Sequence, residues 1–115
     1  PVVADRIMVE QVLLNLLRNA IEAMHDTPMA QRQLLLQVRS TVKGQLQVSV
    51  IDRGHGITPQ AQEKLFAPFF TTKPHGMGMG LNICRSIIEF HHGQLWVEAN
   101  PEGGSIFRFT LPLAS

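Results

Sequence analysis

The 115-residue sequence lacks the features that define several classes of protein. No apolar run approaches the roughly 20 residues of a membrane-spanning helix, so we expect no direct membrane contact by this chain. A single cysteine excludes a disulfide framework within the chain and fits a reducing, cytoplasmic compartment. The formal net charge is only +1 and the Lys and Arg residues are scattered, which argues against a nucleic-acid surface.

What is present is the composition of one globular domain. Hydrophobic residues make up 44% and charged residues 17% of the sequence, as in ordinary soluble proteins. A chain of 115 residues is long enough to bury a single core. The sequence opens at "PVVAD" without an initiator methionine, so we expect residues 1–115 to be one domain of a longer protein.

Periodic patterns predict helices and two hairpins. The predicted helices repeat apolar residues every three or four positions and cover residues 5–24, 58–65 and 79–91. The predicted strands alternate apolar and polar residues and cover residues 33–40, 45–52, 94–99 and 105–113. Asp5 suits the first N-cap, and Gly93 suits the end of the last helix. This order predicts an α+β fold, a two-layer α/β sandwich with helices on one face of a mixed sheet.

Two asparagines stand at the edge of the apolar face of the first helix. Asn15 and Asn19 are four residues apart and therefore share one side of the helix. An unpaired buried carboxamide costs about 1–3 kcal/mol, so each side chain could simply bond to neighbouring backbone. An amide oxygen also suits Mg²⁺ held between protein and phosphates. The residues alone leave both interpretations open.

Asp52 falls in phase with Val48 and Val50 on the core side of the second strand. A carboxylate in that position needs a hydrogen-bond donor, because a buried charge is expensive without one. Gly54 and Gly56 follow and would let a flat ligand approach the backbone. An aspartate that accepts a hydrogen bond from an exocyclic amine here would recognise adenine. The alternative is a turn aspartate that caps its own loop, and the sequence does not choose between them.

Residues 66–84, "FAPFFTTKPHGMGMGLNIC", combine aromatic bulk, hydroxyls, a cation and glycines. Gly76, Gly78 and Gly80 lead into the helix predicted from near Met79, whose first N–H groups could bind an anion. Lys73 adds a positive charge, and two threonines before it add hydroxyl donors. The spacing matches neither the Rossmann fingerprint nor the P-loop, and glycines alone could form only a flexible loop.

Four segments in this order resemble the boxes of the histidine-kinase ATP-binding domain. "NLLRNAIEAM", "DRGHGI", "LFAPFFTTK" and "GMGMGL" are similar to its N, G1, F and G2 boxes. The resemblance covers nearly the whole chain and implies the Bergerat fold, a two-layer α/β sandwich shared with DNA gyrase, Hsp90 and MutL. Within this superfamily the sequence most resembles FixL-like and DctB-like sensor kinases.

The resemblance implies a site for ATP and Mg²⁺. Asn19 would be the metal ligand, Asp52 would bind the adenine amine, and Lys73 would join Asn15 and Asn19 as the catalytic residues. Phe66, Phe69 and Phe70 would anchor a lid over the nucleotide. The implied nucleotide-binding residues are Asn15, Arg18, Asn19, Asp52, Gly54, Gly56, Ile57, Phe66, Thr71, Thr72, Lys73, Gly76, Met77, Gly78, Met79, Gly80, Leu81 and Ser105.

The position four residues before Asn19 separates two reaction classes. In the hydrolysing relatives it is a glutamate that activates water, whereas Asn15 cannot accept a proton at neutral pH. The resemblance therefore implies transfer of the γ-phosphate to a histidine on a separate phosphoacceptor and dimerisation domain of the same protein. It also implies a downstream response-regulator receiver domain and a homodimeric full-length protein, which can be membrane-anchored elsewhere.

The sequence departs from the family in two ways. None of its five histidines lies in a phosphoacceptor helical hairpin. The family's first strand and connecting helix do not precede the first helix, which would leave a sheet edge open.

Two other functions remain as alternatives, a GHKL-type ATP hydrolase and a non-catalytic nucleotide-responsive module.

Two residues have simpler explanations. Cys84, inside the last predicted helix, is expected to pack in the core. Arg18 could contact phosphate or pair with Glu22 one turn later, and the spacing supports both equally.

Overall fold

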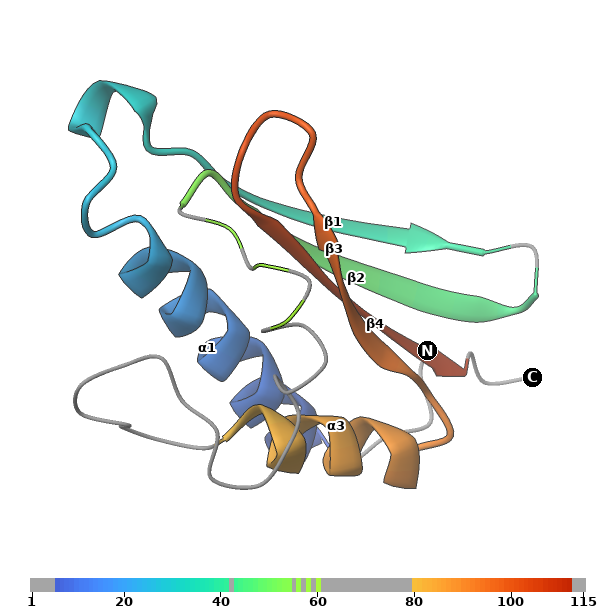
Figure 1. The fold of residues 1–115 in the computed structure, drawn as a ribbon. Helices are drawn as coiled ribbons and strands as arrows, with labels where there is room; N and C mark the ends of the chain where they lie inside the picture. The colour runs from blue at the N-terminus through green and yellow to red at the C-terminus, as the bar shows by residue number, and fades with distance from the viewer. Residues whose placement is uncertain are drawn as a thin grey trace.

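A four-stranded sheet and two α-helices on one of its faces make up the described part of the chain (Figure 1). The computed structural model describes residues 6–41, 43–54, 56, 58, 60 and 80–112. The elements in chain order are α1 (Arg6–Ala23), the 3-10 helix η1 (Met29–Gln31), β1 (Leu34–Ser40), β2 (Gln45–Asp52), α3 (Leu81–Phe90), β3 (Leu95–Ala99) and β4 (Ser105–Pro112). The predicted two-layer α+β fold is confirmed.

The sheet has the strand order β1-β2-β4-β3. Its three described pairings, β1 with β2, β2 with β4 and β3 with β4, are all antiparallel, so the prediction of a mixed sheet is wrong for these residues. The reason lies in the long connection from β2 to β3, which includes α3. It places β3 at the far edge, and β4 returns between β2 and β3, antiparallel to both.

The predicted helix from Asp5 and the helix near Met79 correspond to α1 and α3, and both predicted hairpins form. Asp5 itself and most of the helix predicted over residues 58–65 lie outside the described residues. Gly93 does not supply the left-handed residue that ends the helix, contrary to the prediction. The left-handed residue after α3 is His92, with φ 67°, while Gly93 packs so closely on β4 that a Cβ would collide with the carbonyl oxygen of Thr110.

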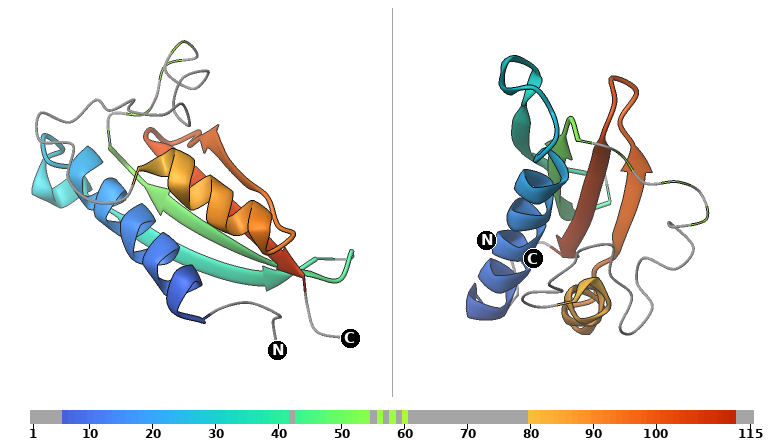
Figure 2. Two further views of the ribbon diagram at one scale, coloured as in Figure 1. Left: turned by 90° about the horizontal axis from the view of Figure 1, so that it is seen from below. Right: turned by 60° about the vertical axis from the view of Figure 1, so that its left-hand side comes forward.

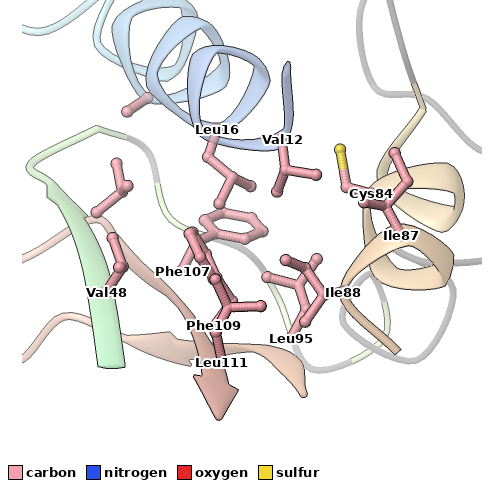
Figure 3. Packing of buried hydrophobic residues seen from close by; sticks show 12 residues of the cluster. Val12, Leu16, Val48, Cys84, Ile87, Ile88, Leu95, Phe107, Phe109 and Leu111 are labelled. Atoms are coloured by element: carbon pink, nitrogen blue, oxygen red, sulfur yellow. The ribbon is translucent and has the colours of Figure 1, made fainter. Parts of the chain in front are cut away.

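The core lies between the helices and the sheet (Figure 3). Helix α1 contributes residues four positions apart, and strands β2 and β4 contribute every second residue, as their periods require. The buried cluster consists of Val12, Leu16, Ala20, Val48, Val50, Cys84, Ile87, Ile88, Leu95, Phe107, Phe109 and Leu111. Helix α1 contacts β2, and α3 contacts both β3 and β4, so each helix covers a different part of the sheet (Figure 2).

Strand β1 forms an edge that the two described helices leave uncovered. All seven of its residues are exposed, including Leu36 and Val38, which pair in register with the buried Val50 and Val48. Within the described helices, no segment is long and apolar enough to cross a membrane.

Candidate functional site

The carboxylate of Asp52 is buried at the end of β2. The alternation of the strand turns it toward the core side, as predicted, and the residue is 1% exposed. Its Oδ1 accepts hydrogen bonds from the N–H groups of Gly54 at 2.8 Å and Ser105 at 3.2 Å. Backbone donors offset part of the cost of burying a charge and fix the orientation of the carboxylate. The bond from Gly54 is the local turn cap that the sequence analysis gave as the alternative role of Asp52. The bond from Ser105 joins two segments that are distant in sequence.

The turn between β3 and β4 holds Asp52 from the other side. Asn100 Nδ2 donates to the carbonyl oxygen of Asp52 at 2.8 Å, and the Asn100 N–H donates to the Gly104 carbonyl at 3.0 Å. Gly104 has φ +98°, and a Cβ there would collide with the Asp52 carbonyl oxygen. Sequence reasoning missed Asn100, because an asparagine beside a predicted turn is ordinary and its partner is 48 residues away.

Gly54 packs against the C-terminal end of α1. A Cβ at Gly54 would collide with the carbonyl oxygen of Ala23. Nearby, Thr27 Oγ1 donates to the Arg53 carbonyl at 3.3 Å. The structure thus supplies a packing reason for glycine at position 54. Its predicted role beside a nucleotide, and that of Gly56 with φ +76°, stay predictions.

The asparagines of α1 differ in their surroundings. Asn15 is 5% exposed, and its Nδ2 donates to Cys84 Sγ at 3.2 Å, a contact between α1 and α3. Asn19 is half-buried and Arg18 is exposed. The predicted place of Asn15 at the edge of the core is confirmed, and so is the packing of Cys84 in the core, but their hydrogen bond was not anticipated.

Burial governs the chemistry of the Cys84 thiol. It raises the pKa of Cys84 above its ordinary value, and the hydrogen bond from Asn15 opposes this rise without cancelling it. The thiol is therefore neutral at pH 7. A neutral sulfur is a weak acceptor that fits an apolar interior.

Helix α3 begins at Leu81, directly after Gly80. Gly80 is the N-cap, with extended backbone at φ −71° and ψ 156°, and it has no side chain to bond the first N–H groups of the helix. The first turn contains no acidic residue. A helix start of this kind favours an anion on general grounds, and the predicted binding of phosphate there stays a prediction.

Helix α1 contacts both of these regions. Near its C-terminal end Ala23 meets Gly54, next to Asp52, and eight residues earlier Asn15 meets Cys84 in α3. Eight helical residues span about 12 Å, and Asn19 lies midway, one turn from each. The C-terminal end of α1 therefore lies near a buried acid, and its middle lies beside the first turn of α3.

Several predicted site residues lie outside the described part of the chain. They are Ile57, Phe66, Phe69, Phe70, Thr71, Thr72, Lys73, Gly76, Met77, Gly78 and Met79. Of the others, Asp52, Gly54 and Ser105 come together, while Asn15 reaches α3, the helix that begins at Leu81 directly after Gly80.

The donor set decides which cation the site could hold. Over residues 6–41, 43–54 and 80–112, no three His, Cys, Asp or Glu side chains gather as a metal cluster. A site for a transition metal is therefore not apparent in that part. Mg²⁺ fits better, because it accepts an amide oxygen together with substrate phosphates and water.

The sequence matches a known family over nearly its whole length. The family model described as "Histidine kinase-, DNA gyrase B-, and HSP90-like ATPase" covers residues 4–115. The chain belongs to this family. Its histidine kinase-like ATPase fold is the one that the four boxes predicted.

Two sensor proteins resemble the chain closely. It is 48% identical over 113 residues to the sensor protein FixL of Bradyrhizobium diazoefficiens. This alignment covers 98% of the present chain and 22% of FixL. It is 47% identical over 110 residues to the C4-dicarboxylate transport sensor protein DctS of Rhodobacter capsulatus. This alignment covers 96% of the present chain and 17% of DctS. The chain thus spans about a fifth of the length of these relatives, and the predicted resemblance to FixL-like sensor kinases is confirmed.

Solved histidine kinases share the fold. The nucleotide-free catalytic domain of ThkA superposes with a TM-score of 0.82 at 41% identity, covering 95% of this chain and 68% of that one. Full-length ShkA in complex with AMPPNP gives a TM-score of 0.81 at 29% identity, covering 99% of this chain and 23% of that one. The antiparallel sheet with two helices is therefore that of a histidine-kinase catalytic domain.

Proposed function

We propose that this chain binds Mg·ATP and presents the γ-phosphate to a histidine on a separate domain of a sensor kinase. The observation that carries the proposal is the arrangement of polar groups along α1. The buried Asp52 carboxylate lies near the C-terminal end of α1, and Asn15 of the same helix contacts α3. Such a site suits a ligand with a flat polar base at one end and anionic phosphates at the other. The solved ShkA, which resembles this chain, was bound to AMPPNP.

The adenine end is built around Asp52. Hydrogen bonds from Gly54 and Ser105 hold the carboxylate in one orientation before any ligand arrives. Such preorganisation lowers the entropic cost of binding. We infer that the carboxylate accepts a hydrogen bond from the adenine amine, with Ser105 close by.

The phosphate end is assigned to the asparagines and to the segment before α3. Asn19 would be a ligand of Mg²⁺, which neutralises phosphate charge when bound. Lys73 and the backbone of residues 76–81 would hold the phosphates at the start of α3, where the helix favours anions. Asn15 would lie beside them.

The absence of a base at position 15 favours transfer over hydrolysis. An amide has no basic lone pair at neutral pH, and Asn15 Nδ2 is already bonded to Cys84. A water molecule would therefore lack the general base that hydrolysis needs at this place. An external nucleophile is the more suitable acceptor.

The relatives support the proposed acceptor and the other proposed partners. FixL and DctS are much longer sensor proteins, which supports a phosphoacceptor and dimerisation domain in the same polypeptide, outside residues 1–115. We further propose a homodimeric parent protein, a response-regulator receiver domain as the downstream partner, and a cytoplasmic location for this domain.

Calorimetry and phosphate release test the proposal. Titration of the chain with ATP should give binding that weakens strongly when EDTA removes Mg²⁺. Release of inorganic phosphate by the same material should be slow. No Mg²⁺-dependent binding would refute the proposal, and rapid steady-state phosphate release would favour a GHKL-type ATP hydrolase. Binding without any histidine phosphorylation in the parent protein would favour a nucleotide-responsive module.

A further inference from the structure

The turn between β3 and β4 lies beside the end of β2, the strand that carries Asp52 (Figure 1). The register of β2 with β4 ends at the pair Ile51 and Ile106, so Asp52 lies one residue beyond it. There Asn100 Nδ2 donates to the carbonyl oxygen of Asp52 at 2.8 Å. A side chain of the turn thus extends the contact between the hairpin and β2 to the residue with the buried carboxylate.

The four polar groups of Asn100 all have partners, and the side chain can sit only one way round. Its N–H donates to the Gly104 carbonyl at 3.0 Å, and its carbonyl accepts from the Gly103 N–H at 2.9 Å. Its Oδ1 accepts from the Glu102 N–H at 3.1 Å, while its Nδ2 donates to Asp52. A backbone N–H only donates and a backbone carbonyl only accepts, so these two partners fix the orientation of the carboxamide.

We propose that Asn100 is a positioning residue for adenine recognition, because its side chain fixes the backbone that sets the Asp52 carboxylate. This role rests on the proposed function. The bond to the Asp52 carbonyl fixes the peptide plane between Asp52 and Arg53. The next peptide carries the Gly54 N–H, which donates to Asp52 Oδ1 at 2.8 Å. Rotation of the first peptide would therefore displace both the carboxylate and one of its donors.

The same turn supplies the second described donor of the carboxylate. Ser105 directly follows the turn, and its N–H donates to Asp52 Oδ1 at 3.2 Å. Gly104 lies so close to Asp52 that a Cβ there would collide with the carbonyl oxygen. Asn100 therefore acts on the carboxylate by two routes, directly through the Asp52 carbonyl and indirectly through the turn that places the Ser105 N–H.

The position of the carboxylate matters because a hydrogen bond weakens steeply as its distance and angle depart from the preferred values. A displaced carboxylate would lose the adenine amine but would leave the contacts with the triphosphate in place. Inosine triphosphate, ITP, has the same ribose and triphosphate as ATP but carries an oxygen in place of the amine. Comparison of the two nucleotides therefore isolates the hydrogen bond to the base.

Three single variants of the 115-residue chain test the role. Asn100→Ala removes both side-chain hydrogen bonds. Asn100→Ser keeps a hydroxyl for the Glu102 N–H, but its side chain is one bond shorter and lacks the NH₂ group that reaches Asp52. Thr41→Ala is the matched control, because Thr41 Oγ1 caps the turn between β1 and β2, at the opposite end of β2, by accepting two backbone N–H groups. Calorimetry measures the dissociation constants for Mg·ATP and Mg·ITP, and a thermal melt measures stability.

We expect the wild type to bind ATP at least about tenfold more tightly than ITP. Asn100→Ala and Asn100→Ser should each weaken ATP binding about three- to tenfold, the range that one hydrogen bond contributes, while ITP binding stays within about twofold. Asn100→Ser should melt at a higher temperature than Asn100→Ala, because it still caps the turn. Thr41→Ala should lower the thermal midpoint and leave both affinities unchanged.

The outcomes separate this role from the proposed function. If the wild-type chain does not bind Mg·ATP, the proposed function fails. Equal affinity of the wild type for ATP and ITP would overturn the adenine assignment of Asp52 and, with it, the role of Asn100. If the wild type prefers ATP but both Asn100 variants keep that preference, or weaken both nucleotides equally, only the positioning role fails.

Should neither Asn100 variant fold, NMR of the wild type decides. Coupling between two contacts is reciprocal, so a bond that positions Asp52 for adenine must itself be strengthened when adenine binds. ATP should therefore slow the exchange of the Asn100 Nδ2 protons more than ITP does at saturation. Equal exchange rates with the two nucleotides would overturn the role of Asn100.

Discussion

The two ends of the site are held by different kinds of contact. At the proposed adenine end, Asp52 is bonded by the backbone of Gly54 and Ser105 and by Asn100 from a tight turn. At the other end, Asn15 is held across two helices by a weak bond to sulfur. Backbone donors move only when the fold moves, whereas a side-chain bond can be remade. We expect the adenine end to be rigid and the phosphate end to be adjustable.

The largest expected effect comes from substitutions of Asp52, which separate the role of its negative charge from the stability of the fold. Asp52→Asn keeps an oxygen that can accept the Gly54 and Ser105 N–H groups, so the thermal midpoint should change little while nucleotide binding falls at least about 100-fold, or roughly 2.7 kcal/mol. Asp52→Ala removes both hydrogen bonds and should lose about 1–3 kcal/mol of stability as well as binding. Calorimetry with a thermal melt measures both. Unchanged affinity in Asp52→Asn would contradict the adenine assignment.

A second test breaks the rigid end through its backbone. Gly104→Ala places a Cβ against the Asp52 carbonyl oxygen at a φ of +98°, so stability should fall by about 2–4 kcal/mol, with nucleotide binding lost in the same variant. Gly103→Ala is the control, because it has φ +100° but nothing within 4 Å of the new Cβ. It should cost about 1 kcal/mol of strain and spare binding. Equal losses in denaturant titrations of the two variants would show that the contact with Asp52 is unimportant.

A substitution at the adjustable end should change Mg²⁺-dependent nucleotide binding rather than the stability of the fold. Asn19 is half-buried, so Asn19→Ala should keep the thermal midpoint while weakening Mg·ATP binding at least about tenfold, or roughly 1.4 kcal/mol. Titrations with and without Mg²⁺ measure the effect. If the parent protein carrying Asn19→Ala were phosphorylated normally, the metal assignment would be wrong.

The smallest effect concerns the pH dependence of stability. Burial raises the pKa of Cys84 in the folded state from an ordinary value of 9.0, so the unfolded thiol ionises first as pH rises. The contribution of this group is complete below pH 9.0 and is lost as pH rises from there toward the folded pKa. Urea melts from pH 7 to 10 should show a steeper loss in the wild type than in Cys84→Ser. Native Cys84 should also resist alkylation at pH 8, and rapid labelling without unfolding would disprove its burial.

Much of the fold could be predicted because its signals are local. Helix α1, both hairpins and the core-side position of Asp52 follow from the periods of their own segments. The site was harder, because its contacts join distant segments. The pairing of Ser105 with Asp52 and the place of Asn100 depend on how β4 returns beside β2. No local period encodes that return.

The amino-acid sequence by itself determined the helices, the hairpins, the family boxes and the chemistry available at each position, since these depend on neighbours a few residues apart. Only the tertiary structure decided that the described sheet is antiparallel, that Gly54 packs on Ala23 and that Asn15 meets Cys84. Those contacts bridge tens of residues. They form only when burial of the shared core brings α1, α3 and the sheet together, and hydrophobic burial selects a packing without specifying partners in advance.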